Sequence, residues 1–316
     1  MAHTSSKDME EALYFSNPNV YKAKRILKSV LLYLLLILQG LLVLLPFYIM
    51  ILTSVKDAGA FQGSIESFEW WVPLKNAFEN AKFNYVHAYE KINFGRSMFN
   101  TILVAAIGTF GTVITTVLAA FAFSRLNFKG KNILFALFMT TMMVPGEMFI
   151  ITNYITVGKF GWVGMGQTYT KAILCETIPF MTSIFYIYYL RQTFMTIPNE
   201  LYYAAKVDGT TDLKYLFKVM IPIASGTIIS ITILNAMSSW NAYIWPSLVT
   251  DVSNKDYQLV TAALRQASFT IGDNGTLPDY AGQMAAAFMV TIPLLVVFFA
   301  LKKYIMRGVS RSGIKG

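Results

Sequence analysis

Charged residues are scarce in this chain of 316 residues: Asp, Glu, Lys and Arg make up 14% of it, whereas hydrophobic residues make up 55%. An average soluble domain carries about 25% charged residues, so the chain has too few to cover a surface that faces water. The charges are also unevenly distributed. Charge-free segments lie between Lys28 and Lys56, Arg96 and Arg125, Lys218 and Asp251, and Asp279 and Lys302. Each is long enough to cross a membrane as a helix, which takes about 20 mostly apolar residues.

Residues and motifs of catalytic chemistry are also scarce. The chain has two histidines, His3 in the N-terminal tail and His87, so a His-rich metal site cannot form within its apolar segments. Cys175 is the only cysteine, which excludes an intrachain disulfide and indicates a small apolar residue within a helix. No Gly-x-x-x-x-Gly-Lys-Ser/Thr motif occurs, so the chain lacks the loop that binds nucleotide phosphates. We therefore predict no enzyme activity, no metal and no cofactor on this chain.

We predict an all-α membrane protein with six transmembrane helices. Besides the four charge-free segments, the apolar stretches Ile133 to Val157 and Lys171 to Leu190 each contain one acidic residue, Glu147 and Glu176. A charge near the middle of a spanning helix costs a few kcal/mol, so four spans and two buried helices are the alternative. Such a charge should face other helices or a water-filled path. For Glu147, packing against other helices and a place on a water-filled path are both open. Glu176 lies near the outer end of its helix, which favours a position at the membrane interface.

The distribution of Lys and Arg predicts the orientation. With six spans, the N-terminal tail, the loops at 125–131 and 191–222, and the C-terminal residues from Lys302 onward lie on one side and hold 17 of the 26 Lys and Arg residues. Cytoplasmic loops are enriched in these residues, so we predict that both termini are cytoplasmic. The net charge of +9 then reflects topology and not nucleic-acid binding. The predicted divisions are a tail (1–28), a first helix (29–55), an external aromatic-rich segment (56–97), a core of five spans (98–304) with an external loop (251–283), and a tail (305–316).

The predicted cytoplasmic loop at 191–222 has the pattern of two short helices. Pro198 can begin the first, with Glu200 in its first turn, where the helix dipole favours an acidic residue. Gly209 supplies a break, and Asp212 can cap the second helix. The second helix has apolar residues at i, i+3, i+4 and i+7, namely Leu213, Leu216, Phe217 and Met220. This pattern predicts an element that docks onto another protein.

The same loop resembles the EAA loop of permeases from binding-protein-dependent ABC importers. The family pattern is Glu-Ala-Ala, three residues, Gly, nine residues and Ile-x-Leu-Pro; residues 203–205, Gly209 and 219–222 stand at the same spacing. Tyr203 stands where the family usually has Glu, and Glu200, one turn earlier, is the candidate to replace its charge. The resemblance implies that the loop contains the coupling helix, which sits in a cleft of a partner ATPase. It assigns to this contact Glu200, Tyr203, Ala204, Ala205, Asp208 and Gly209.

The resemblance extends to the maltose-type carbohydrate-uptake branch of these permeases and covers nearly all of residues 42–316. The further matching segments are 46–47, 53–56, 100–101, 119–131, 143–147, 239–241 and 308–316. The resemblance implies an importer in a prokaryotic cytoplasmic membrane. Its partners are a second permease, two ATPase subunits that hold ATP and Mg²⁺, and an extracellular solute-binding protein that delivers a sugar or oligosaccharide. Glycerol phosphate and polyol importers share the branch, so a non-sugar solute is the alternative.

The fifth predicted span concentrates polar and aromatic residues. Sugars are bound by aromatic faces together with amide and hydroxyl hydrogen bonds, and this span offers both. An aromatic belt at the outer membrane surface, with Ser and Asn linking helices, is the alternative. The residues that we predict to line a substrate path are Glu147, Ser239, Trp240, Asn241 and Tyr243.

Two other classes of protein fit less well. A secondary transporter usually shows internal repeats and half-helices near the middle of the membrane, and the two halves of this chain show no clear repeat. A membrane-bound enzyme needs reactive groups that the sequence lacks.

Overall fold

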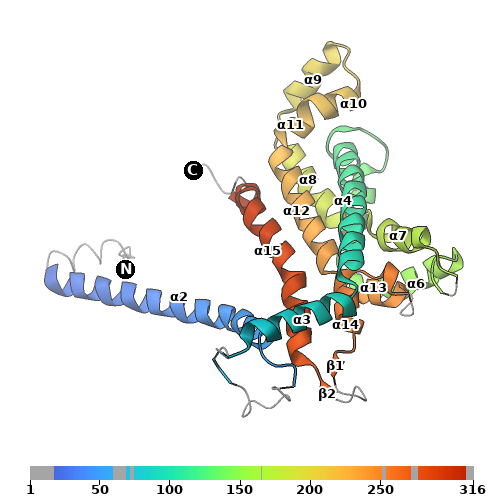
Figure 1. The fold of residues 1–316 in the computed structure, drawn as a ribbon. Coiled ribbons are helices and arrows are strands. Elements are labelled where there is room, and N and C mark those ends of the chain that lie inside the picture. The colour runs from blue at the N-terminus through green and yellow to red at the C-terminus, as the bar shows by residue number, and fades with distance from the viewer. Residues whose placement is uncertain are drawn as a thin grey trace.

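The computed structural model describes residues 18–59, 69–71, 75–164, 166–250, 254–271 and 277–310. Most of these residues are helical, and one small antiparallel hairpin, β1 (Thr270–Ile271) with β2 (Leu277–Pro278), lies at one end of the molecule (Figure 1). The predicted all-α class is confirmed at this level.

In the part of the chain that the structure describes, three helices are long and apolar enough to cross a membrane: α2 (Pro18–Ser54), α4 (Phe94–Arg125) and α15 (Tyr280–Ser310). They match the first, second and sixth predicted spans. Helix α2 begins earlier than the predicted position 29, because Pro18 stands at its first position, where the ring favours helix initiation.

The other predicted spans are bent. In the first pair, α5 (Lys131–Thr141) makes an angle of 86° with the segment formed by η2 (Gly146–Met148) and α6 (Phe149–Lys159). In the second pair, the segment formed by α7 (Tyr169–Thr177) and η3 (Ile178–Phe180) makes an angle of 50° with α8 (Ile184–Met195). The third pair joins α10 (Asp212–Tyr215), the π-turn η4 (Leu216–Met220) and α11 (Ile221–Ile223) to α12 (Ser225–Asn241) at 81°. The described residues thus contain up to six spans if each bent pair is one span, and the count of six stays a prediction.

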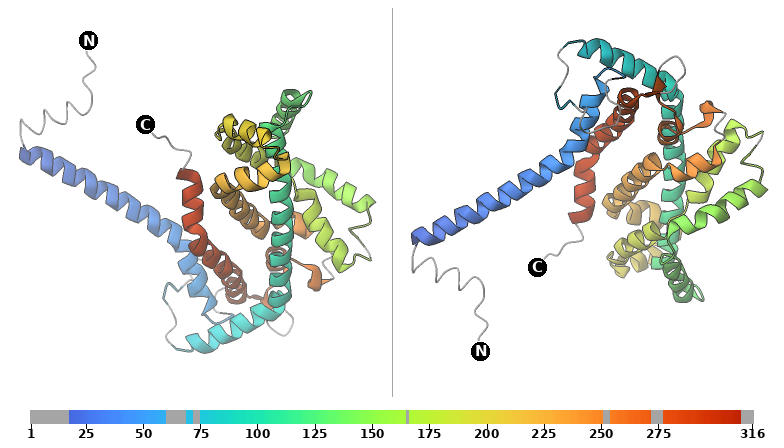
Figure 2. Two further views of the ribbon diagram at one scale, coloured as in Figure 1. Left: turned by 90° about the horizontal axis from the view of Figure 1, so that it is seen from above. Right: turned by 90° about the horizontal axis from the view of Figure 1, so that it is seen from below.

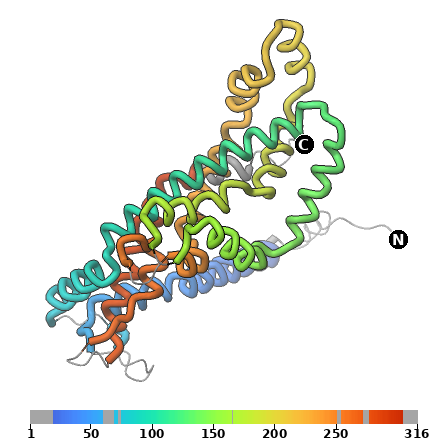
Figure 3. Tube along the Cα trace, turned by 90° about the vertical axis from the view of Figure 1, so that its right-hand side faces the viewer, coloured from blue at the N-terminus to red at the C-terminus, as the bar shows by residue number. Residues whose placement is uncertain are grey.

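Helix α4 forms the centre of the bundle. Helices α8 and α12 pack along it, and α15 packs against α12, α2 and α3 (Ala77–Lys91) (Figures 2 and 3). The largest buried cluster joins α4, α8 and the segment that leads into α12. Its members include Val117, Phe121, Leu190, Phe194, Tyr215, Leu216 and Met220. This cluster fixes the base of the loop that carries α9 (Asn199–Val207).

The opposite end of the bundle is closed by short elements. Helix α3 packs with α14 (Val260–Gln266) and α15 around a second buried cluster, and α13 (Ile244–Val249) and η5 (Lys255–Tyr257) lie nearby. Part of the predicted external loop at 251–283 is helical, since it contains α14, and Gly272 and Gly275 lie outside the described residues. In the predicted aromatic-rich segment at 56–97, Trp71 and Phe78 are 81% and 77% exposed, and Phe61 and Phe68 lie outside the described residues.

Helix α2 extends away from the bundle over most of its length (Figures 1 and 2). Every side chain from 31 to 39 is exposed, and nearly all of them are apolar. A surface of this kind does not occur on monomeric soluble proteins, so it faces lipid or another protein.

Candidate functional site

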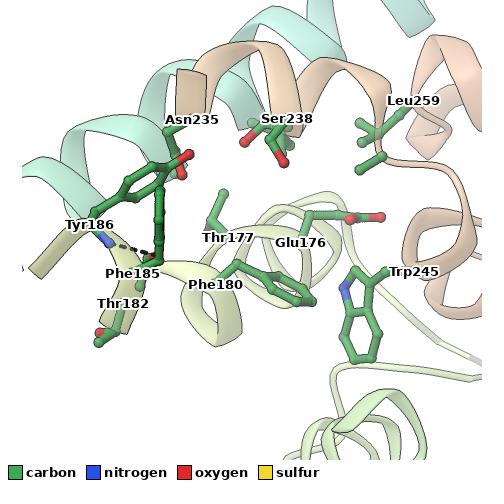
Figure 4. Close-up of a pocket in the computed structure, with 15 residues that line it drawn as sticks. Glu176, Thr177, Phe180, Thr182, Phe185, Tyr186, Asn235, Ser238, Trp245 and Leu259 are labelled. Atoms are coloured by element: carbon green, nitrogen blue, oxygen red, sulfur yellow. Dashed lines mark hydrogen bonds between the residues drawn. The ribbon is translucent and has the colours of Figure 1, made fainter. Parts of the chain in front are cut away.

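A cavity of about 450 Å³ lies between α4, α7, α8 and α12 (Figure 4). Such a volume is within the usual range for small-molecule sites, about 300–1,000 Å³. One face is polar, with hydroxyl and amide groups, and another is aromatic. The lining residues are Val104, Gly108, Glu176, Thr177, Phe180, Thr182, Ser183, Phe185, Tyr186, Asn235, Ser238, Ser239, Ala242, Trp245 and Leu259.

The break between α7 and α8 shapes the cavity. The backbone carbonyls freed at this break accept hydrogen bonds from two threonines of α4: Thr112 Oγ1 donates to Phe180 O at 3.2 Å, and Thr115 Oγ1 donates to Met181 O at 2.5 Å. Gly111 allows the close approach, because a Cβ at that position would lie 2.6 Å from the Met181 side chain. Non-helical backbone is tolerated within a membrane where it is covered by protein in this way.

Helix α12 supplies the polar face. Asn235, Ser238, Ser239 and Ala242 follow the i, i+3, i+4, i+7 spacing of one helix face. Asn235 Nδ2 donates to Thr109 Oγ1 of α4 at 3.1 Å, which fixes the amide beside the cavity.

Trp245 forms the rigid aromatic wall. It is 5% exposed, its Nε1 donates to the carbonyl of Cys175 at 3.2 Å, and its ring meets Phe180 edge to face at a centroid distance of 5.4 Å. Cys175 itself is fully buried in the same cluster, as an apolar residue within a helix.

Only one of the five predicted path residues, Ser239, lines the cavity. Asn241 is exposed, and its side chain donates to Met237 O of its own helix; Tyr243 is 41% exposed and lies under the guanidinium of Arg265. Trp240 is half-buried on another face of α12, and Glu147 is exposed at the break between α5 and α6. These four do not line the cavity.

Sequence reasoning missed Glu176 as a cavity residue. Its position near a helix end favoured an interface, but its side chain is 7% exposed and lines the cavity (Figure 4). The signal that could have found the α12 residues was the spacing of Asn235, Ser238 and Ser239 on one face.

A second candidate site is the protruding loop that contains α9 and α10 (Figure 1). Helix α9 begins directly after Pro198, and Gly209 has φ +71°, as the predicted break requires. The predicted cap was wrong: Thr211, not Asp212, caps α10, with its Oγ1 accepting from Lys214 N. Asp212 instead joins the two helices, because its Oδ1 lies 2.7 Å from both Lys206 Nζ and the Tyr202 hydroxyl. This hydrogen bond with Asp212 raises the pKa of Lys206 above its usual range.

The outer surface of this loop exposes apolar residues beside charged ones. Four of the six residues predicted to contact an ATPase, Glu200, Tyr203, Ala204 and Asp208, have exposed side chains; Gly209 is exposed, and Ala205 is half-buried. The predicted single apolar face of the second helix is divided: Leu216 and Met220 are buried, whereas Leu213 and Phe217 remain exposed. The π-turn η4 alters the helical spacing there. The exposed apolar residues of the loop are Leu201, Tyr203, Val207, Leu213 and Phe217.

Arg125 connects α4 to this loop. Its side chain is 7% exposed; Nη2 donates to Phe194 O at 2.8 Å and to Ile197 O, and Nη1 donates to Asn199 Oδ1. The planar guanidinium can serve several acceptors at once. The last turn of α4 is thereby attached to the end of α8 and the first residue of α9.

Comparison with known proteins identifies the family. Residues 111–311 match the family described as "Binding-protein-dependent transport system inner membrane component". The chain belongs to this family. It is therefore a permease, a multi-pass component of the cytoplasmic membrane.

The permease is similar over most of its length to curated members of the family. It is 29% identical to the melibiose/raffinose/stachyose import permease protein MelC of Bacillus subtilis (strain 168), over 86% of this chain and 91% of that protein. It is 27% identical to the sn-glycerol-3-phosphate transport system permease protein UgpE of Yersinia pestis bv. Antiqua (strain Antiqua), over 89% and 95%. It is 26% identical to the lactose transport system permease protein LacG of Rhizobium radiobacter, over 92% and 97%.

The permease also shares its fold with a solved structure. A chain from the crystal structure of a bacterial ABC transporter involved in the import of the acidic polysaccharide alginate matches with a TM-score of 0.73 and 22% identity, over 89% of this chain and 97% of that chain.

Proposed function

We propose that this permease is one transmembrane subunit of an ATP-driven importer for a sugar or oligosaccharide. Its partners are a second permease, ABC ATPase subunits that hold ATP and Mg²⁺, and an extracellular solute-binding protein. The observation that carries the proposal is the loop of α9 and α10, which protrudes from the bundle, has an exposed apolar surface and carries the EAA spacing.

The loop is suited to docking in a cleft of an ATPase. Its two helices are held at a fixed angle by Lys206, Asp212 and Tyr202, so a displacement of α9 is transmitted to α10 and on to α12. Ala204 and Ala205 allow close approach of a partner backbone, as small residues do. Tyr203 replaces the usual Glu with an exposed aromatic ring, and Glu200 supplies the negative charge one turn earlier.

The path of the solute runs past α12. Ser239 and its neighbours on the cavity face form the wall on this subunit, and the predicted residues Trp240, Asn241, Tyr243 and Glu147 would contact the solute only in another conformation or beside the partner permease. The orientation with both termini in the cytoplasm, and six spans, complete the proposal.

The names of the relatives bear on the choice of solute. MelC and LacG are named for sugars, which supports a sugar, and UgpE is named for sn-glycerol 3-phosphate, which keeps that anion as an alternative. A secondary transporter is the second candidate, because the helix breaks beside Pro145 and after Phe180 resemble the broken helices of that class. The protruding loop disfavours it, because such a transporter has no ATPase to bind.

Reconstitution tests the division of labour. The complex with its partner subunits in liposomes should accumulate solute only with ATP, at a rate raised by loaded binding protein. The isolated permease should neither bind nor hydrolyse nucleotide. Nucleotide binding by the isolated chain, or uptake driven by an ion gradient without the ATPase, would contradict the proposal.

A further inference from the structure

Among the described residues that line the cavity, Glu176 is the one acidic residue. Its side chain is more than nine-tenths buried, and Oε1 accepts one long hydrogen bond, 3.3 Å, from Thr250 Oγ1. The other carboxyl oxygen has no hydrogen-bond partner among the described residues. A carboxyl group in a membrane protein is costly unless it is paired or lines a functional path, and a carboxyl group can accept up to about four hydrogen bonds. Most of that capacity is unused here and faces the cavity.

The rest of the cavity wall defines the chemistry of a ligand. The lining residues include no Lys, Arg or His, so this wall offers no counter-charge to an anion. Thr182, Ser183, Ser238 and Ser239 offer hydroxyl groups, and the fixed ring of Trp245 borders the same space (Figure 4). Hydroxyl groups both donate and accept, whereas a carboxylate only accepts. The arrangement matches a solute that is rich in hydroxyl donors and carries no negative charge.

We propose that this cavity is a solute-binding site on this subunit, that Glu176 accepts hydrogen bonds from hydroxyl groups of the solute, and that the site takes neutral polyhydroxylated solutes and rejects anionic ones. The inference rests on the proposed function, since it names the class of solute that the importer carries. It separates this permease from the importers of sn-glycerol 3-phosphate and of acidic alginate to which relatives and neighbours belong. A phosphate or uronate group would give up its hydration in this cavity, and none of the described lining residues is a cation that could offset that cost.

The experiment uses the assembled importer in liposomes with its binding protein, and its probes are raffinose and sn-glycerol 3-phosphate. We expect ATP-driven uptake of raffinose and none of sn-glycerol 3-phosphate. Glu176→Gln keeps the size and one carbonyl acceptor but removes the charge and half of the acceptor capacity, and it should lower raffinose uptake at least tenfold. The yield of the assembled complex should stay at the parent value, which separates a loss of solute binding from a loss of folding.

Two matched variants separate a binding role from a structural one. Lys171→Gln removes a charge from the same helix outside the cavity and should leave uptake unchanged. Thr250→Ala removes the protein partner of the carboxyl group but leaves the carboxyl group itself, and it should retain most of the uptake. Any one of three results would overturn the proposal. They are parent-level uptake of raffinose by Glu176→Gln, loss of the complex in that variant, and uptake of sn-glycerol 3-phosphate by the parent. No ATP-driven uptake of either probe would contradict the proposed function, and with it this inference; normal uptake of raffinose by Glu176→Gln would overturn the inference alone.

Discussion

Arg125 shows how one side chain can link a spanning helix to a loop outside the membrane. A buried cation is costly unless its donors are satisfied. Nη1 and Nη2 of Arg125 donate to the carbonyls of Phe194 and Ile197 and to the amide oxygen of Asn199, whereas Nε is buried without a partner among the described residues. All three acceptors lie where α8 ends and α9 begins. The same bonds therefore offset part of the cost of burial and fix the base of α9 against α4.

Arg125→Lys should weaken this link while keeping the charge. The ammonium group is a point donor and cannot reproduce the planar fork of the guanidinium, and each charge-assisted hydrogen bond that is lost contributes about 1.5–3 kcal/mol. We expect the complex to assemble with a lower melting temperature and to hydrolyse more ATP per solute imported. The ratio of hydrolysis to uptake in liposomes measures this uncoupling.

Arg96→Lys is the control for the arginine substitution. Arg96 lies at the other end of α4, where it donates to Asp256 O and stacks on Tyr169. It makes no contact with the loop, so its ratio of hydrolysis to uptake should equal that of the parent. An unchanged ratio in Arg125→Lys as well would show that the Arg125 link does not carry the coupling.

At the scale of elements, the loop of α9 and α10 depends on one backbone conformation. Gly209 has φ +71°, and a Cβ at this position would meet no atom within 4 Å. Any effect of a substitution there thus arises from the backbone and not from a steric clash. The left-handed conformation costs most L-residues about 1–2 kcal/mol, whereas Asn tolerates it.

Gly209→Val should therefore disturb the angle between α9 and α10, and Gly209→Asn should not. We expect co-purification of the ATPase with Gly209→Val to weaken about tenfold, the equivalent of about 1.4 kcal/mol, while membrane insertion stays normal. Ala205→Asp should also weaken co-purification of the ATPase. The reason is electrostatic, because the substitution would place a charge at a half-buried position beside the main buried cluster. ATPase co-purification at the parent level in both Gly209→Val and Ala205→Asp would show that this loop is not the docking element.

The sequence predicts best those elements whose ends are marked by residues with a fixed or unusual backbone preference, such as Pro and Gly. Pro198 and Gly209 mark the start and the break of the loop because Pro fixes φ and Gly accepts a positive φ. Thr211 and Asp212 can both cap a helix, and the choice between them depends on Lys206 and Tyr202, which a helical pattern does not include. A pattern of 3.6 residues per turn does not predict the π-turn at 216–220 either. Such a pattern places Leu213 and Phe217 on the same face as Leu216 and Met220, whereas Leu213 and Phe217 are exposed.

The cavity was predicted less well, because it is a property of several packed elements. Trp240 and Asn241 have the right chemistry for a sugar, but the rotation of α12 about its axis is set by its packing on α4 and α15, which directs Asn235 and Ser238 to the cavity instead. Glu176 reaches the cavity because α7 ends in a break that Gly111, Thr112 and Thr115 stabilise from another helix. No local pattern around Glu176 contains these residues.

At the scale of the whole molecule, the bundle has two chemically different ends. The loop of α9 and α10 and the C-terminal end of α4 lie at one end, and α3, α14 and the hairpin lie at the other (Figures 1 and 3). The predicted cytoplasmic loops at 125–131 and 191–222 fall at the first end. Helix α2 has 37 residues, about 55 Å at 1.5 Å per residue, so it is longer than the hydrocarbon layer of about 30 Å. We therefore expect its first turns, with Lys22, Lys24 and Arg25, to extend beyond the membrane.

Cysteine labelling can test this orientation directly, because the chain has a single native cysteine and that cysteine is buried. Cys175→Ala should be tolerated at this fully buried apolar position at a cost of less than about 1.5 kcal/mol. In that background we would place one cysteine at a time at two exposed positions, Trp71 at the α3 end and Val207 in the loop, which are 81% and 88% exposed. With both termini in the cytoplasm, a membrane-impermeant maleimide added to intact cells should modify the Trp71→Cys variant only. The Val207→Cys variant should react after the membrane is permeabilised, provided that the permease is expressed without its ATPase, which would cover the loop. Reaction of both variants in intact cells would contradict the topology on which the positions of the cavity, the coupling loop and the binding protein all depend.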